Sequence, residues 1–443
     1  MIHPIRILAA FCLFVVTSWA ETRPNIIVIL ADDLGYEDIA CFGNDRIETP
    51  NIDALARDGI RFTDFHSNGA VCSPTRAALM TGRYQQRTGI SGVVTARGHR
   101  DTGLPLKEIT IAELVKPAGY RTALFGKWHL GYDPKYNPIR QGFDEFIGFV
   151  SGNVDFHIHI DQTGIEDWWK QDQLEPEDGY TTDLITKHSV EFIKRNASTN
   201  SVLGKGRPFL LYIAHESPHY PYQGRSTPPV YIPGEGRDKD KDKATPEVYK
   251  EMIEVMDEGI GHIRQAVEDA GLSHNTLIIF SSDNGPAGPG SAGPLREKKG
   301  SFYEGGHRVP TVAFWPGIIE AGRISNETLM GADLFPTFSE ISGASIPEGV
   351  EIDGVSLLPH LKNAEPLPQR QLYWGIKGQV AVRRGDFKLI ANENFTKAEL
   401  YNLRDDIGET TDIADSHPEL VSELLEAAHT WLDEVTAGVE KRT

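Results

Sequence analysis

The sequence predicts an α/β fold: a doubly wound, mostly parallel sheet flanked by helices, with a smaller C-terminal antiparallel sheet plus one helix. Apolar runs rich in β-branched residues, at 25–30, 208–214 and 276–281, are typical of strands buried on both faces of a parallel sheet. Helical patterns stand between these runs, as in a doubly wound sheet. From about residue 366, short strands separated by turns indicate a separate antiparallel sheet.

The predicted elements of the large sheet and its helices follow in order. Thr49 and Pro50 are typical of a helix start, and Gly59 of its end. The stretch 142–177 has no clean period and is rich in aromatic residues and histidine, so it is interpreted as a functional loop region or a packed surface subdomain. The charged stretch 233–245 is expected to be a mobile surface loop. The other predicted elements are a strand at 61–65, a helix at 109–118, a strand at 120–125, a helix at 181–195, a strand at 208–214, a helix at 246–270, strands at 276–281 and 311–315, and a helix at 332–341.

The C-terminal pattern predicts four short strands and a final helix. These elements are strands at 372–376, 379–384, 388–391 and 399–402 and a helix at 418–435. We therefore expect a main α/β domain at 21–365 and a C-terminal α+β subdomain at 366–443. The 443 residues are long enough for both.

Residues 1–20 have the pattern of a secretory signal peptide. Arg6 supplies a positive flank, residues 7–16 an apolar stretch, and Ser18-Trp19-Ala20 a small-x-small cleavage site. The apolar stretch is too short for a membrane span. The sequence therefore predicts a secreted or periplasmic protein without stable membrane insertion.

The net charge of the chain restricts its partners. A formal charge of −19 argues against a nucleic-acid-binding protein. An anionic ligand would need a locally basic pocket.

The stretch after Cys72 places a cysteine at a helix start. Pro74 suits the first helical turn, residues 77–80 are strong helix formers, and Gly82 can end the helix. Free N–H groups and the helix dipole favour an anion at such a position. Arg76 could point back to the same place. Cys72 is either a nucleophile at an anion site or a buried free cysteine.

The other cysteines leave one structural alternative. Cys12 would be removed with the signal peptide, and an exported protein could join Cys41 to Cys72 in a disulfide. That bond would occupy the cysteine at the helix start, and a chain of this length does not need it.

Polar residues follow four of the predicted strands. In a doubly wound sheet the ligand site lies beyond the carboxyl ends of the strands, so these side chains are expected to meet. Taken alone, Asp32 and Asp33 after the first strand could be part of a solvated loop with a helix cap. The residues are Asp32, Asp33, Lys127, His129, His215, His219, Asp283 and Asn284.

These residues divide into two chemical groups. Asp32, Asp33, Asp283 and Asn284 offer hard oxygen ligands, which suit Ca²⁺ or Mg²⁺ better than zinc. The second group offers cations and hydrogen-bond donors for a tetrahedral oxyanion: Arg76, Lys127, His129, His219 and Lys299. Together the two groups predict a site that polarises a sulfate or phosphate ester.

At these positions the chain resembles the type I sulfatases of the alkaline-phosphatase-like superfamily. Cys-x-Pro-Thr-Arg at 72–76, with Thr-Gly-Arg at 81–83, matches the first family signature, with Thr75 where serine is commoner. Gly-Lys-Trp-His-Leu-Gly at 126–131 matches the second. Asp-Asp after the first strand, His-Tyr-Pro at 219–221, Asp-Asn-Gly at 283–285 and a Lys-Gly before Tyr-Glu-Gly-Gly at 303–306 also match.

The resemblance implies that Cys72 is converted to Cα-formylglycine by a formylglycine-generating or sulfatase-maturating enzyme. One hydroxyl of the aldehyde hydrate would attack sulfur, and the other would later expel sulfate. It implies a bound Ca²⁺, with Mg²⁺ less favoured, held by Asp32, Asp33, Asp283, Asn284 and position 72.

The resemblance also implies a role for each remaining motif residue. Arg76 would stabilise the hydrate, and His129 would assist collapse of the hemiacetal. Lys127, His219 and Lys299 would hold sulfate oxygens, with His219 or Lys299 protonating the leaving alcohol. Asp283 would take the proton of the attacking hydroxyl.

Substrate recognition is assigned to residues outside these motifs. Ser151 is placed at sulfate by loose resemblance, while Asp155, His157, His159 and His215 are candidates for sugar recognition. The expected activity is hydrolysis of a sulfate ester on a carbohydrate. The alternatives are a phosphate or phosphonate monoester hydrolase of the same superfamily and a non-catalytic carbohydrate-binding relative.

Overall fold

The computed structural model describes residues 23–198, 206–376, 378–392 and 394–443. The predicted signal peptide at 1–20 lies outside these residues. Among the described residues, no helix is long and apolar enough to cross a membrane.

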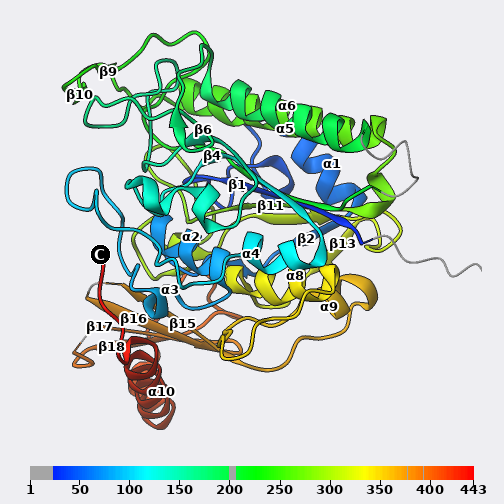
Figure 1. Cartoon of the computed structure of the whole chain (residues 1–443). Coiled ribbons are helices and arrows are strands. Elements are labelled where there is room, and N and C mark those ends of the chain that lie inside the picture. The colour runs from blue at the N-terminus through cyan, green and yellow to red at the C-terminus, as the bar shows by residue number, and fades with distance from the viewer. Residues whose placement is uncertain (1–22, 199–205, 377, 393) are drawn as a thin grey trace, which may run out of the picture.

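A ten-stranded mixed sheet forms the centre of the protein (Figure 1). Its five inner strands, in the order β11-β1-β8-β4-β5, are parallel, while β12 runs antiparallel to β11. In sheet order the strands are β13 (Arg323–Ser325), β2 (Ile60–Phe62), β12 (Thr311–Phe314), β11 (Thr276–Ser282), β1 (Asn25–Ala31), β8 (Phe209–Ala214), β4 (Arg121–Lys127), β5 (Glu145–Phe149), β6 (Trp169–Lys170) and β7 (Gln173–Leu174).

Helices cover both faces of this sheet (Figure 1). Alternate residues of β1 point into two separate cores: Ile26 and Val28 into one, Ile27 and Ile29 into the other. The first core is closed by α2 (Cys72–Thr81), α4 (Ile111–Val115) and α8 (Leu334–Ser342), and the second by α1 (Pro50–Asp58), α5 (Thr181–Ser198) and α6 (Pro246–Asp269). Strands buried on both faces explain the continuous apolar runs in the sequence.

A four-stranded antiparallel sheet lies beside this assembly, next to α10, as Figure 1 shows. It packs in a third core around Trp374, which also includes Ala70 and Phe302 from the larger part of the chain. We call β15–β18 the C-terminal sheet. Its elements are β15 (Gln371–Ile376), β16 (Gln379–Arg384), β17 (Phe387–Asn392), β18 (Ala398–Asn402) and α10 (Pro418–Thr436).

The remaining elements are short. The helices are α3 (Gln85–Thr88), α7 (Glu304–His307) and α9 (Leu358–Asn363). Two strand pairs complete the fold: β3 (Phe65–His66) with β14 (Leu329–Met330), and the hairpin of β9 (Tyr231–Ile232) and β10 (Gly236–Arg237).

The predicted fold class and the order of long elements are confirmed, with local differences; the expected helix at 109–118, for example, is α4 followed by a 3₁₀ turn at Lys116–Ala118. The expected strand at 61–65 is two strands, β2 and β3. The stretch 142–177 contains β5, which lacks a β-branched run and is ordered by pairing with β4. The stretch 233–245 contains β10. Lys127, expected in a loop, is the last residue of β4 because its backbone pairs with Phe149.

Candidate active site

The ends of four adjacent parallel strands bring the sequence-predicted polar residues together. Strands β11, β1, β8 and β4 are neighbours in the sheet and parallel, so their carboxyl ends form one edge. Asp283 follows β11, Asp32 follows β1, His215 follows β8, and Lys127 ends β4.

Cys72 lies at this edge as the first residue of α2. The helix ends at Gly82 in the left-handed conformation, as its sequence predicts. No side chain caps the N-terminus of α2, so this end has the electrostatic character that favours an anion. Cys72 is buried and free, and Cys41 is free as well, so the alternative of a disulfide between them is not realised.

Carboxylate and amide oxygens lie on one side of Cys72. Its Sγ is 3.3 Å from Oδ1 of Asp32 and 4.0 Å from Oδ1 of Asp33. The backbone N–H of Asp33 donates to Asp283 at 3.3 Å, and the Asn284 amide donates to Asp33 Oδ1 at 2.8 Å. These four oxygen-bearing side chains are fully or almost fully buried.

This oxygen cluster fits a divalent cation. Oδ2 of Asp33 and Oδ1 of Asn284 are buried without a hydrogen-bond partner, and such acceptors are costly to bury unless something binds them. Ligand atoms of Asp32, Asp33, Cys72 and His219 all lie within 4.8 Å of one another. Hard oxygen ligands favour Ca²⁺ or Mg²⁺.

Two lysine ammonium groups contact the same oxygen cluster. Lys299 Nζ lies 3.3 Å from Cys72 Sγ and 2.5 Å from Oδ1 of Asp33. The Lys127 ammonium contacts the Asp32 carboxylate and is fully buried. Cations that can contact an anionic ligand are therefore present at the site although the whole chain is acidic.

Two histidines complete the site. His129 Nε2–H donates to the Val94 carbonyl at 2.9 Å, and its buried Nδ1 has no partner. His219 Nδ1–H donates to the Tyr220 carbonyl at 2.5 Å, which leaves Nε2 3.6 Å from Oδ2 of Asp33. Each ring therefore keeps one nitrogen free for chemistry in the site.

The backbone at this edge is strained at two of the residues. Asp33 and His129 have φ angles of 62° and 56°, in a region that side-chain-bearing residues rarely adopt. Such conformations persist where the surrounding fold enforces them and cluster at functional sites.

The buried charges shift the pKa values of the carboxyl groups in opposite directions. Burial raises the pKa of Asp283 to about 6, helped by the neighbouring charge of Asp32. Burial also acts to raise the pKa of Asp33, but the charges of Lys299 and His219 outweigh it and lower that pKa to about 2. Burial raises the pKa of the Cys72 thiol, with the charge of Asp283 adding to the effect. An unmodified Cys72 is therefore a protonated thiol and a poor nucleophile.

Two of the predicted substrate residues lie close to this site. Ser151 follows β5, and its hydroxyl donates to the Asn153 carbonyl at 2.8 Å. The next residue, Gly152, packs on His129, since a Cβ there would lie 2.7 Å from Nε2 of that ring. His215 is fully buried, and both of its ring nitrogens lack partners.

The other three predicted substrate residues, Asp155, His157 and His159, contact the backbone or an aromatic ring of neighbouring loops. Asp155 Oδ2 accepts backbone N–H groups of Val230 and Tyr231 at 2.7 and 2.9 Å. His157 contacts the Gly224 carbonyl. His159 lies against the Trp168 ring with 4.6 Å between centroids. These contacts fix the loops around the three residues, and their role in sugar recognition stays a prediction.

Sequence reasoning missed a stacked group beside His219. The Tyr220 ring stacks on His219 at 4.2 Å between centroids, and the Arg237 guanidinium lies 4.1 Å from the centre of the Tyr220 ring. Arg237 also donates to Asp242 at 2.6 Å. No sequence spacing links 237 to 219, because the contact depends on the β9–β10 hairpin folding back.

Comparisons with known proteins agree with this geometry. Residues 24–344 match the family model for sulfatases, and residues 297–436 match the model for the C-terminal region of N-sulphoglucosamine sulphohydrolase. Human arylsulfatase A is 35% identical over 398 residues, which cover 82% of this chain and 74% of the relative. Human N-acetylgalactosamine-6-sulfatase is 32% identical over 397 residues, covering 84% and 72%.

A solved structure resembles the whole chain. The crystal structure of Ps i-CgsB in complex with k-i-k-neocarrahexaose has a TM-score of 0.82 and 30% identity, and the match covers 95% of this chain and 94% of that chain. With one family model spanning most of the sequence and relatives of this identity and coverage, the chain belongs to the sulfatase family, and it is a sulfatase.

Proposed function

We propose that this sulfatase removes sulfate from a sulfated carbohydrate, using Cα-formylglycine derived from Cys72 as nucleophile and a bound Ca²⁺. The observation that carries the proposal is the position of Cys72, with Asp32 Oδ1 and Lys299 Nζ each 3.3 Å from Sγ. Carboxylate oxygens that can hold a metal ion and a lysine ammonium group, both next to position 72, suit a nucleophile that attacks a polarised sulfate ester.

The proposed metal ligands are Asp32, Asp33, Asp283, Asn284 and position 72. Their oxygen chemistry and the two unpartnered acceptors support Ca²⁺, with Mg²⁺ as the less favoured ion. Bound there, the ion would polarise a sulfate oxygen and lower the charge density of the carboxylate cluster.

Formylglycine would supply a geminal diol, one of whose hydroxyls attacks sulfur while the other permits release of sulfate without attack by water. Arg76, held by Asp283 through Nε and Nη2 at 3.0 and 2.8 Å, would stabilise the hydrate from one turn after Cys72 in α2. Asp283 would accept the proton of the attacking hydroxyl.

The remaining side chains bind the anion and move protons. Lys127, His219 and Lys299 would contact the sulfate oxygens, with Ser151 beside them. Lys299 or His219 would protonate the leaving alcohol. The unpartnered Nδ1 of His129 would take a proton from the second hydroxyl as sulfate leaves.

The substrate class rests on the relatives. N-acetylgalactosamine-6-sulfatase is named for an amino sugar, and Ps i-CgsB was solved with a neocarrahexaose. We propose an aqueous extracellular or periplasmic location, a signal peptide at 1–20, and a boundary near residue 365 between the α/β domain and the C-terminal subdomain.

Mass spectrometry of the peptide carrying Cys72 tests the nucleophile. Protein made in a host with a maturation enzyme should show the mass of the aldehyde or its hydrate, and Cys72→Ala should be folded and inactive. An unmodified thiol in fully active protein would contradict the formylglycine mechanism.

Matched substrate pairs test the reaction. Sulfated mono- and oligosaccharides should be hydrolysed in preference to the same sugars carrying phosphate. Faster turnover of phosphate or phosphonate esters would favour the alternative within the superfamily. Binding of the sugars without turnover by fully converted protein would indicate the non-catalytic alternative.

A further inference from the structure

The Tyr-Glu-Gly-Gly motif at 303–306 contains a buried carboxylate that the proposed mechanism does not use. Glu304 has no exposed surface, and its side chain contacts cations instead of Cys72 or the oxygen cluster. Its Oε1 lies 2.8 Å from Lys388 Nζ, and its Oε2 lies 3.1 Å from Arg308 Nη1. Lys388 belongs to β17 of the C-terminal sheet.

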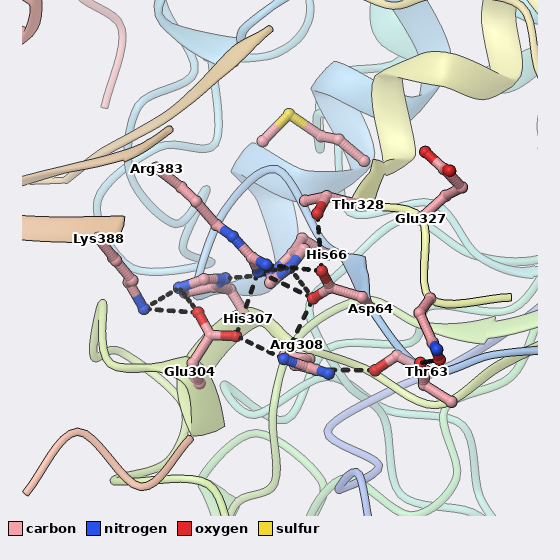
Figure 2. Close-up of polar contacts among 12 residues, drawn as sticks. Thr63, Asp64, His66, Glu304, His307, Arg308, Glu327, Thr328, Arg383 and Lys388 are labelled. Atoms are coloured by element: carbon pink, nitrogen blue, oxygen red, sulfur yellow. Dashed lines mark hydrogen bonds and ion pairs between the residues drawn. The ribbon is translucent and has the colours of Figure 1, made fainter. Parts of the chain in front are cut away.

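Glu304 is part of a buried ion cluster between the large sheet and the C-terminal sheet. Figure 2 shows Arg383 and Lys388 reaching from the C-terminal strands toward Asp64 and Glu304. The ion cluster consists of three carboxylates and three cations: Asp64, Glu304, Glu409, Arg308, Arg383 and Lys388. Its charges balance, as buried ions require.

Two histidines fill the centre of the ion cluster and exclude a metal there. Ligand atoms of His66, Glu304 and His307 lie within 4.8 Å of one another, but protein groups already use them. His66 Nε2 lies 2.9 Å from Asp64 Oδ1, the Nδ1 atoms of His66 and His307 lie 3.0 Å apart, and Lys388 Nζ lies 3.1 Å from His307 Nε2. With three cations around it, this group is an anchor and not a metal site.

The glycines that follow Glu304 pack directly against the backbone on either side of Lys299. A Cβ on Gly305 would lie 2.2 Å from the carbonyl oxygen of Glu297, and one on Gly306 would lie 1.9 Å from that of Ser301. Only glycine permits this approach. Displacement of Glu304 would therefore displace the whole turn that carries Lys299.

The same turn contacts two other loops of the active site. The Gly300 N–H donates to the Ala70 carbonyl, in the loop that leads into α2, at 2.8 Å. The Gly285 N–H, next to Asn284, donates to the Gly306 carbonyl at 2.9 Å. The ion cluster therefore lies directly behind the loops that hold the nucleophile, the proposed metal ligands and the sulfate-binding lysine.

We propose that Lys388 is a positioning residue for the active site: through Glu304 it fixes the turn that presents Lys299 to the sulfate group. This inference rests on the proposed function for the role of Lys299. It assigns the C-terminal sheet a part in catalysis although none of its residues contacts Cys72.

The test compares a charge-balanced double variant of the ion cluster with a control variant elsewhere in the fold. Lys388→Met combined with Glu409→Gln removes one cation and one carboxylate, so the ion cluster stays neutral while Glu304 loses its contact with the C-terminal sheet through Lys388 and keeps its contact with Arg308. Arg87→Met is the matched control, because Arg87 pairs with Asp353 at 3.0 Å and with Glu434 of α10 at 2.6 Å, apart from the turn that carries Lys299.

Each variant is measured for thermal unfolding, for kcat and KM, and for binding of inorganic sulfate by calorimetry, alone and combined with Lys299→Ala. We expect the Lys388/Glu409 variant to be folded, to lose kcat about 10- to 100-fold, and to bind sulfate more weakly. Both losses should be absent in the Lys299→Ala background, because coupled residues are non-additive. Arg87→Met should lower the unfolding midpoint only.

Wild-type kcat and sulfate affinity in the folded variant would overturn the proposal, as would equal losses with and without Lys299. If the double variant does not fold, the same measurements are made on Glu304→Gln, which removes the charge of the other partner in the Glu304–Lys388 ion pair. If the wild type hydrolyses no sulfate ester, the proposed function fails, while the sulfate-binding measurements still decide whether Lys388 positions Lys299.

Discussion

Arg76 holds Asp283 with two nitrogens of one guanidinium, Nε at 3.0 Å and Nη2 at 2.8 Å from the same Oδ2. Both side chains are almost completely buried. The pair joins α2, at the fifth residue from its start at Cys72, to the residue that follows β11. A helix and a strand more than 200 positions apart in the chain are thereby fixed at the point where chemistry is proposed.

Replacing Arg76 should damage stability and activity together. Arg76→Met leaves the buried Asp283 carboxylate unpaired, which costs about 3–5 kcal/mol, and removes a donor to the proposed hydrate, which lowers kcat by about 100- to 1,000-fold. Arg76→Lys should recover part of the stability, since one ammonium replaces a two-pronged contact. Urea unfolding and steady-state kinetics measure both effects, and a Met variant equal to wild type in either would contradict this reasoning.

Calcium should stabilise the folded protein. Free Ca²⁺ at 100 times its dissociation constant should raise the unfolding free energy by about 2.7 kcal/mol, and chelation should remove both this gain and the activity. Asp33→Asn should abolish the calcium-dependent shift, whereas Asp240→Asn, at an exposed carboxylate, should leave it unchanged. Calorimetric unfolding with and without Ca²⁺ measures this stabilisation. A chelator-treated protein with full activity and an unchanged unfolding midpoint would exclude the metal.

The meeting of Asp32, Lys127 and Asp283 could be predicted because it needs only two facts: the strands are parallel, and parallel strands end at one edge. The helix start at Cys72 could also be predicted, since Pro74 and Gly82 act locally. The position of the nucleophile and of these charged residues could therefore be predicted from local sequence patterns.

Contacts made by irregular chain could not be predicted in this way. Asp33 and His129 have positive φ angles, and although aspartate and histidine are enriched among such residues, most aspartates and histidines have negative φ, so residue type alone does not identify these two positions. The reach of Lys388 to Glu304 depends on how two sheets pack, which no local spacing encodes. The Tyr-Glu-Gly-Gly motif includes Glu304, but the motif does not predict that Lys388 is its partner.

The buried histidine pair should make the protein less stable in mild acid. Burial lowers the pKa of His66, and burial with the charge of Lys388 holds the pKa of His307 well below its usual range. A folded-state pKa below the unfolded value of about 6.5 means that the stabilisation is present above that pH and is lost as pH falls below it.

For His307, whose folded-state pKa is well below its usual range, the unfolding free energy should fall by about 1 kcal/mol between pH 6.5 and pH 5.5. His307→Gln should make the slope between pH 6.5 and 5.5 shallower by that amount. His262→Gln, at an exposed histidine, is the control and should not change it. Equal slopes in all three proteins, measured by urea unfolding at each pH, would show that the pair does not titrate on unfolding.

Arg237 should support catalysis through the ring stack on His219. Its guanidinium lies 4.1 Å from the centre of the Tyr220 ring, and that ring stacks on His219 at 4.2 Å. Arg237→Met keeps an unbranched chain over Tyr220 but removes the cation, whose interaction with the ring is worth about 0.5–2 kcal/mol. We expect kcat/KM for a sulfated sugar to fall about 2- to 30-fold, because a less restrained Tyr220 holds His219 less firmly. Lys241→Met removes an exposed cation from the same stretch and should leave kcat/KM unchanged, so an equal loss in both variants would mean that general charge attraction, and not the stack, is responsible.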